Sequence, residues 1–328
     1  MMEKQRDDQM DNIRAILIFC VVTGHVISNF GETTGTDAVY KIIFSFHMPA
    51  FLFVSGYFAR YNPKKLFASL FPLYVIFQIA QYLERWLILG ITDGNWEMGG
   101  FDFFIPQWTL WYLVALMMFQ LLLPLFETDN KKKQAGFLIL SAALGMLVGF
   151  TPDTDNFMAM SRVFVFLPFY LWGYYERKNQ ILRHLDRRSW FPAARGIAAA
   201  AGIVLAVGFC LFENRIVAKN FYGTDAFADG GMIAGRVFAW ATAVVWILIL
   251  LIWTPRRRLW MMETIGKNTL PVYLFHSLAI LVLVRTPLYT LMQGRLAPVL
   301  ILAAALTVLL SREPLEKLLR KVKLPYKN

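Results

Sequence analysis

Arg14 and His25 are ionisable side chains in the first apolar segment of the chain, within the run DNIRAILIFCVVTGH at 11–25. On a helix, this spacing brings the two side chains to nearly the same face and separates them by about 16 Å, roughly half a bilayer. Ionisable groups inside a membrane span are costly and usually face a bundle interior or a wet cavity. An imidazole can take a proton from a hydroxyl group and a guanidinium can bind a phosphate, so this stripe is a candidate functional site.

Further polar or aromatic side chains in or beside apolar segments are candidates to line the same site. Asp11 shares the face of His25 but lies about 20 Å from it along the axis, so it cannot orient the imidazole. Each candidate also has a structural interpretation: snorkelling for the arginines, Arg14 included, an aromatic belt for the tryptophan, and helix packing or a buried polar role for the rest. The candidate site-lining residues are Asp11, His47, Ser55, Trp111, Arg162, Tyr273 and His276. HxxxH, CxxC and clustered inward carboxylates are absent from the sequence, which predicts no metal site.

The composition excludes a water-soluble domain. The chain has 328 residues, of which 57% are hydrophobic and only 17% charged, against about 25% charged residues in soluble domains. The net charge of +11 comes from basic residues in short connectors rather than from one cluster, which argues against nucleic-acid binding. Cys20 and Cys210 both lie in apolar segments and predict buried thiols rather than disulfides.

The elements that must position these side chains are membrane helices, and the sequence predicts an all-α polytopic membrane protein. About ten transmembrane helices are expected, near residues 13–30, 40–59, 66–89, 109–127, 135–150, 162–175, 195–213, 232–254, 269–285 and 292–311. Connectors rich in Lys and Arg, such as 131–133, 177–188 and 256–258, alternate with connectors that lack both, such as 94–103 and 151–156. Basic connectors stay in the cytoplasm, so an even number of spans places both termini there.

No long soluble insertion or low-complexity tract interrupts these windows. We therefore expect one transmembrane domain over 1–328, with a core at about 11–310 and a basic cytoplasmic tail at 311–328 that lies against anionic lipid headgroups. The expected location is the cell (inner, cytoplasmic) membrane, crossed several times.

Five blocks of the chain resemble, in order and spacing, the acyltransferase-3 family of integral-membrane O-acyltransferases. They are DNIRAILIFCVVTGH, FSFHMPAFLFVSGYF, WTLWYLVAL, RVFVFLPFYLWGYY and IGKNTLPVYLFH. The likeness is nearest to the fucose 4-O-acetylase-like branch and runs from about residue 11 to 310. It implies transfer of an acyl group, usually acetyl from cytosolic acetyl-CoA, to a hydroxyl of a glycan or lipid-linked sugar at the outer side of the membrane. Acyl-CoA is then a donor substrate, and no bound cofactor is implied.

The resemblance also assigns residues. The essential Arg and His of the family fall on Arg14 and His25, and its block with His, Pro and Ser-Gly falls on His47, Pro49, Ser55 and Gly56. Many members carry an Arg-x-Arg pair before the third helix, where this chain has PKKLFASLFPLY. Lys64 and Lys65 are therefore the candidates for that positive charge in acyl-CoA binding.

The chemistry at His25 has two routes that the sequence does not separate: general base on the acceptor hydroxyl, or transient acceptor of the acyl group. A second function class is a secondary transporter that exports a small molecule or an acylated product, since such bundles also use intramembrane His and Arg. It is weakened because no paired, broken spans mark two inverted halves. A third is a membrane scaffold with structural histidines.

Overall fold

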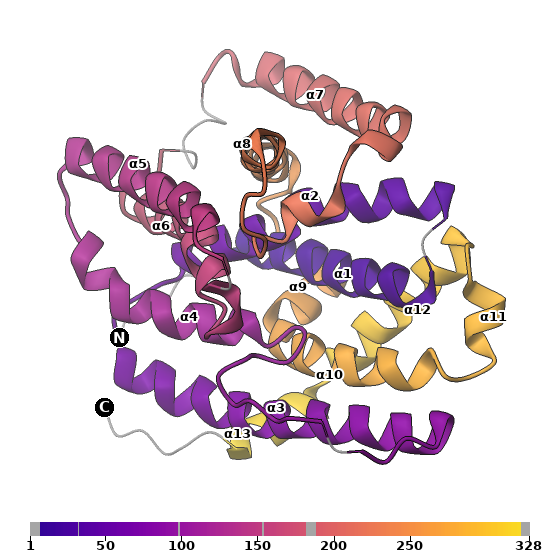
Figure 1. Ribbon diagram of the computed structural model, residues 1–328. Coiled ribbons are helices and arrows are strands. Elements are labelled where there is room, and N and C mark those ends of the chain that lie inside the picture. Colours follow the sequence, from indigo (N-terminus) through magenta and orange to yellow (C-terminus); the bar gives the residue numbers. More distant parts are fainter. Residues whose placement is uncertain (1–6, 32, 98, 153, 182–187, 323–328) are drawn as a thin grey trace.

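The computed structural model describes residues 7–322 apart from Glu32, Met98, Asp153 and 182–187 (Figure 1). Every regular element of the described residues is helical. The α-helices are α1 (Asp8–Phe30), α2 (Thr34–Tyr57), α3 (Pro63–Asp93), α4 (Trp111–Leu122), α5 (Lys131–Leu147), α6 (Met160–Asn179), α7 (Phe191–Leu211), α8 (Gly230–Trp253), α9 (Trp260–Lys267), α10 (Thr269–Leu283), α11 (Leu288–Met292), α12 (Leu296–Leu310) and α13 (Glu313–Val322). Short 3-10 turns are η1 (Leu123–Phe126), η2 (Val148–Phe150), η3 (Thr154–Asn156), η5 (Glu213–Arg215) and η6 (Ala218–Phe221).

The predicted all-helical, polytopic class is confirmed. Within the described chain, six helices are long and apolar enough to cross a membrane, and the number rises to eight if the bent pairs α9–α10 and α12–α13 are each one span. Of the ten predicted windows, 109–127 and 162–175 are helical but do not meet this length and hydropathy criterion. The first corresponds to α4 with η1, which is short, and the second to α6, whose charged residues at both ends shorten its apolar stretch. The basic stretch 182–187 and the end of the tail, 323–328, lie outside the described residues.

Helices α1 and α2 form the centre of the bundle (Figure 1). In α1 61% of the most apolar window is buried, against 11% in α7, which packs mainly on α8 and faces outward along most of its length. Helix α1 contacts α2, α9, α10 and α12, and α2 contacts α6 and α8 as well. Any side chain on the inner face of α1 therefore points into protein rather than into lipid.

Side-chain caps and ties fix the end of the bundle where α1 begins. The carboxylate of Asp7 caps α1 by accepting from the backbone N–H of Met10. One turn later, the Asn12 side chain donates to the carbonyls of Pro255 and Arg257, each at 3.0 Å. These contacts join the start of α1 to the basic connector between α8 and α9, and hold the turn that carries Arg14.

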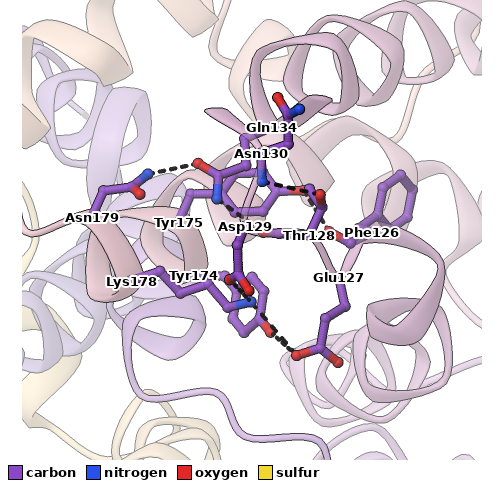
Figure 2. A network of polar contacts seen from close by, with 10 residues as sticks. All are labelled: Phe126, Glu127, Thr128, Asp129, Asn130, Gln134, Tyr174, Tyr175, Lys178 and Asn179. Atoms are coloured by element: carbon purple, nitrogen blue, oxygen red, sulfur yellow. Dashed lines mark hydrogen bonds and ion pairs between the residues drawn. The ribbon is translucent and has the colours of Figure 1, made fainter. Parts of the chain in front are cut away.

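The connector between α4 and α5 is tied to the end of α6 by a polar network (Figure 2). Asn179 donates to the side chain of Gln134 at 2.6 Å, and Lys178 lies 3.1 Å from the carboxylate of Asp129. Because Asp129 and Lys178 are largely exposed, their ion pair contributes little by itself. The network instead brings the basic residues of 131–133 and 177–178 to one end of the bundle.

Helices α2 and α6 approach each other at two glycines. A Cβ added to Gly56 would overlap the carbonyl of Tyr170, and a Cβ added to Gly173 would overlap the carbonyl of Phe53. Small residues allow two helix backbones to approach closely, as in other membrane helix pairs. Gly56 and Gly173 therefore serve the close packing of α2 against α6.

We expect Gly56→Ala to destabilise the protein, because the overlap is with backbone and requires the two helices to separate. Overpacking of this kind costs about 1–3 kcal/mol and lowers the apparent melting temperature in detergent by about 3–10 °C. Gly196→Ala in α7 is the matched control, because nothing lies within 4 Å of its added Cβ. Equal melting temperatures for the two variants, measured by intrinsic fluorescence, would contradict the packing role.

Candidate functional site

A cavity of about 320 Å³ surrounds His25 near the end of α1. It lies among α1, the first half of α2, residues 108–111, the start of α6, the segment 221–224 and α10, so six parts of the chain meet there. Its polar and aromatic lining consists of His25, Ser28, Tyr40, Phe44, His47, Trp108, Thr109, Trp111, Arg162, Phe166, Phe221, Tyr222, Thr224 and Tyr273. We call this the outer cavity, after connectors at this end of the bundle such as 94–103 and 151–156, which lack basic residues.

His25 is held in the outer cavity by ring contacts rather than by a side-chain hydrogen bond in the described structure. Its imidazole meets Trp108 edge to face with ring centroids 5.1 Å apart, and Phe44 at 5.9 Å. Across the cavity, Nδ1 of His47 donates to the carbonyl of Ile43 at 2.8 Å, which leaves Nε2 of His47 as an acceptor. The outer cavity thus offers two imidazoles beside aromatic faces.

Trp108 adopts a left-handed backbone conformation, with φ of 30°, that a non-glycine residue rarely takes. Contacts on both sides hold it there: the Gln78 side chain accepts from the N–H of Gln107 at 2.8 Å, and the hydroxyl of Tyr273 donates to the carbonyl of Thr109. Such strain persists only where the surroundings over-determine it, and it clusters at functional sites. Here it presents the indole of Trp108 to His25.

Arg162 lies at the other side of the outer cavity and is already paired. Its Nε is 3.1 Å from both carboxylate oxygens of Asp155, and its guanidinium stacks over Trp111 at 4.9 Å from the ring centroid. The pair neutralises Arg162, so this arginine orients Trp111 and Asp155 rather than adding free positive charge to the cavity.

A larger cavity of about 600 Å³ lies at the opposite end of α1, and we call it the inner cavity. Its polar lining consists of Arg14, Ser55, Arg60, Asn62, Lys65, Ser69, Tyr112, Gln120, Tyr170, Thr269 and Tyr273. The guanidinium of Arg14 lies over the ring of Phe58 at 4.2 Å and 3.6 Å from the carboxylate of Asp11. Three cationic side chains, Arg14, Arg60 and Lys65, thus face one cavity, which suits a ligand with several phosphates.

The two cavities meet at three side chains, Val21, Met48 and Tyr273, which line both. Val21 is on α1 between Arg14 and His25. The inner and outer cavities therefore lie along the same face of this helix, one toward each end. These three side chains therefore form the junction that separates the inner cavity from the outer cavity around His25.

The structure brings together most of the residues predicted from the sequence. Lys65, Ser55 and Tyr273 line the inner cavity with Arg14, and His47, Trp111, Arg162 and Tyr273 line the outer cavity with His25. Three of the predicted residues line neither cavity. Asp11 is buried against Arg14, Lys64 is exposed beside Lys65, and His276 lies beside His25.

Sequence reasoning left out several lining residues, among them Arg60 and Trp108. Arg60 follows the FVSGYFA run directly and lies three residues beyond the end of the helix that carries Ser55. Trp108 was missed because its positive φ has no signature in the sequence. Among the described residues, no group of three or more His, Cys, Asp or Glu could hold a metal ion.

Comparison with known proteins gives a family. A family model described as an acyltransferase domain, that of the acyltransferase-3 family, matches residues 7–312. The nodulation protein NolL of Sinorhizobium fredii (strain NBRC 101917 / NGR234) is 27% identical over 206 residues, which is 55% of this chain and 52% of NolL. The chain thus spans about half the length of that relative. No solved structure matches.

The matched range includes both cavities and all of the candidate spans apart from α13, the second helix of the last bent pair. The chain is a multi-pass membrane protein by its helices and its family alike. With the family model covering residues 7–312, this protein belongs to the acyltransferase-3 family of acyltransferases.

Proposed function

We propose that the protein is an O-acyltransferase that moves an acyl group, acetyl in the first instance, from acyl-CoA to a hydroxyl of a glycan or lipid-linked sugar. The observation that carries this proposal is the pair of cavities on one face of α1, cationic at one end and lined by imidazoles at the other, which meet at Val21, Met48 and Tyr273. Donor and acceptor can then approach from opposite sides and react at the junction.

The inner cavity is the proposed donor site. Coenzyme A carries several phosphate negative charges, and Arg14, Arg60 and Lys65 face this cavity. The same end of the bundle gathers the basic connectors, which favours the cytoplasm for this side and for both termini. The donor therefore enters from the compartment that contains acyl-CoA, and its thioester points along α1 toward His25.

The outer cavity is the proposed acceptor site. Sugars stack on aromatic rings and hydrogen-bond to hydroxyls, and Trp108, Trp111, Tyr222 and Thr224 supply both kinds of group. The resemblance to the fucose 4-O-acetylase-like branch favours a deoxyhexose unit of a glycan or a lipid-linked sugar as the acceptor.

In the proposed reaction, His25 takes the proton of the acceptor hydroxyl as the oxygen attacks the thioester carbonyl. The C–S bond then breaks, and the proton held on His25 passes to the departing thiolate. A transient acyl group on His25 is the other route, and it predicts labelled enzyme in the absence of acceptor. Trapping the enzyme with labelled acetyl-CoA alone separates the two routes.

The test of the function uses the purified full chain in proteoliposomes with radiolabelled acetyl-CoA and a methyl fucoside or isolated lipid-linked glycans as acceptor. We expect label in the acceptor and release of free CoA in equal amounts. Movement of acceptor or acetyl-CoA across the bilayer without label transfer would instead favour the secondary transporter.

For Arg14→Ala we expect weaker acetyl-CoA binding with the fold retained. Loss of a charge-assisted hydrogen bond to phosphate costs about 1.5–3 kcal/mol, which corresponds to about 10- to 100-fold in Kd. Titration calorimetry measures the affinity, and Arg85→Ala, which changes an exposed arginine of α3 outside both cavities, is the control. An unchanged affinity for Arg14→Ala would remove this residue from the donor site.

We also propose that the chain forms one transmembrane domain in the cell membrane, with a core at about 11–310 and a basic tail on the cytoplasmic face. Helix α13, which begins the tail, contacts α3 and α10 and carries Leu319 buried against the bundle. Its basic residues, such as Lys317 and Arg320, are exposed and suit anionic headgroups. Accessibility of single cysteines in the tail to a membrane-impermeant reagent tests this orientation.

A further inference from the structure

We propose that His276 is the positioning partner of His25: its Nε2 accepts a hydrogen bond from the His25 ring and so fixes which nitrogen of His25 faces the outer cavity. The proposal rests on the proposed function, because it assigns His25 a role in proton transfer. His276 is a fully buried side chain in α10 and lines neither cavity.

The hydrogen bonds of His276 fix its tautomer. Its Nδ1 lies 2.7 Å from the carbonyl of Tyr273 and 3.1 Å from the carbonyl of Val272. Carbonyl oxygens only accept, so Nδ1 carries the hydrogen and donates it to the helix backbone. In the neutral ring Nε2 is therefore a lone-pair acceptor.

That acceptor is buried and has no hydrogen-bond partner among the residues that the structure describes. Leaving a buried polar atom unpaired costs about 1–3 kcal/mol, so such atoms in native proteins usually have a specific reason. The ring nearest to His276 with a donor to offer is that of His25.

The geometry of the two rings fits a hydrogen bond after a small rotation. Their centroids are 5.3 Å apart and their planes differ by 35°, whereas two imidazoles joined by one N–H···N bond have centroids about 5 Å apart. Trp108 contacts both rings, at 5.1 Å from His25 and 6.5 Å from His276, and limits how far they can separate. The strained backbone of Trp108 thus keeps the pair together.

His276 is better placed for this role than His47. The ring of His47 lines the outer cavity and therefore competes with the acceptor for space. His276 is screened from both cavities, so a bond from His25 to His276 leaves the second nitrogen of His25 free on the cavity side. This is the base-and-orienter arrangement of other nucleophilic sites, with an imidazole where a carboxylate is more usual.

The proton balance is simple. The free nitrogen of His25 takes the hydroxyl proton and later gives it to the departing thiolate, while the other nitrogen keeps its hydrogen and donates it to His276 throughout. A positive charge then forms on His25 next to a lone pair instead of next to apolar side chains. His276 therefore supports the charged form of His25 during transfer without touching substrate.

Two amide variants test the proposal. In His276→Asn the amide nitrogen can replace Nδ1 on the backbone carbonyls, but nothing replaces Nε2. In His276→Gln the longer side chain brings an amide oxygen to the place of Nε2. We expect His276→Asn to lower acetyl transfer to a methyl fucoside about 10- to 100-fold, and His276→Gln to lower it by less than about threefold, with unchanged acetyl-CoA affinity in calorimetry for both.

A readout independent of transfer is the rate at which diethyl pyrocarbonate modifies His25, followed by peptide mass spectrometry. We expect slower modification of His25 in His276→Asn and near wild-type modification in His276→Gln, with His47 unchanged in both. Equal losses in the two variants, or none in either, would overturn the proposal. If wild type transfers no acetyl group, the proposed function fails, and the modification rates still decide whether His276 positions His25.

Discussion

His25→Ala is expected to abolish detectable acyl transfer while acetyl-CoA still binds with near wild-type affinity. A positioned general base contributes about 10²- to 10⁴-fold to rate. The donor site is about 16 Å away along α1, so loss of the imidazole leaves the contacts of Arg14 intact. Label transfer from acetyl-CoA and calorimetric titration measure the two quantities separately.

Ser28→Ala is the matched control, because Ser28 lines the same cavity one turn from His25 and its hydroxyl contacts only nearby groups of α1, such as the His25 carbonyl. We expect its transfer rate to stay within about threefold of wild type. Undiminished transfer in His25→Ala would remove this residue from the chemistry. A parallel loss of acetyl-CoA binding would point instead to a structural role in the bundle.

Met48→Trp is expected to block transfer by filling the junction between the cavities. Met48 is half-buried and lines both cavities, so a larger ring at this position occupies the space through which the thioester must pass. A displacement of about 1 Å from the reactive geometry already costs about 100-fold, and a blocked junction costs at least as much. Acetyl-CoA binding should persist, since the cationic residues lie at the far end of the inner cavity.

Met48→Leu serves as the control for Met48→Trp, because it conserves volume and is expected to keep most activity. Both variants are compared by transfer rate, acetyl-CoA affinity and melting temperature in detergent. Full activity of Met48→Trp with normal stability would mean that donor and acceptor do not meet through this junction. That outcome would remove the observation on which the proposed function mainly rests.

The sequence predicted the helices well because the length and hydropathy of one continuous segment are enough to predict a membrane span. All ten apolar windows are helical, and Asp7, Asn62 and Asn130 cap helices through their own side chains. The number of membrane spans is harder to predict from the sequence than the helices themselves. Helix α6 is charged at both ends, so its composition alone does not predict a membrane span, yet it is a helix inside the bundle. Burial between α2, α4 and α5 replaces apolar composition there.

The candidate site was predictable where its residues share one helix. Arg14 and His25 are placed by helix periodicity alone, and both line cavities on that face of α1. His47, Trp111 and Arg162 were plausible on chemical type, but their meeting at one cavity depends on how α2, α4 and α6 pack. Lys64 and Lys65 are adjacent in sequence, yet only Lys65 faces the inner cavity, because neighbouring residues on a helix point about 100° apart.

By itself the sequence determined that this protein is a helical membrane protein with an imidazole and a guanidinium on one face of its first span, since hydropathy and periodicity are local properties. Only the tertiary structure decided that the two lie in cavities that meet, that Arg60 joins the cationic end, and that His276 lies beside His25. Those facts depend on crossing angles, close glycine contacts and a strained tryptophan, which arise only when separate helices pack.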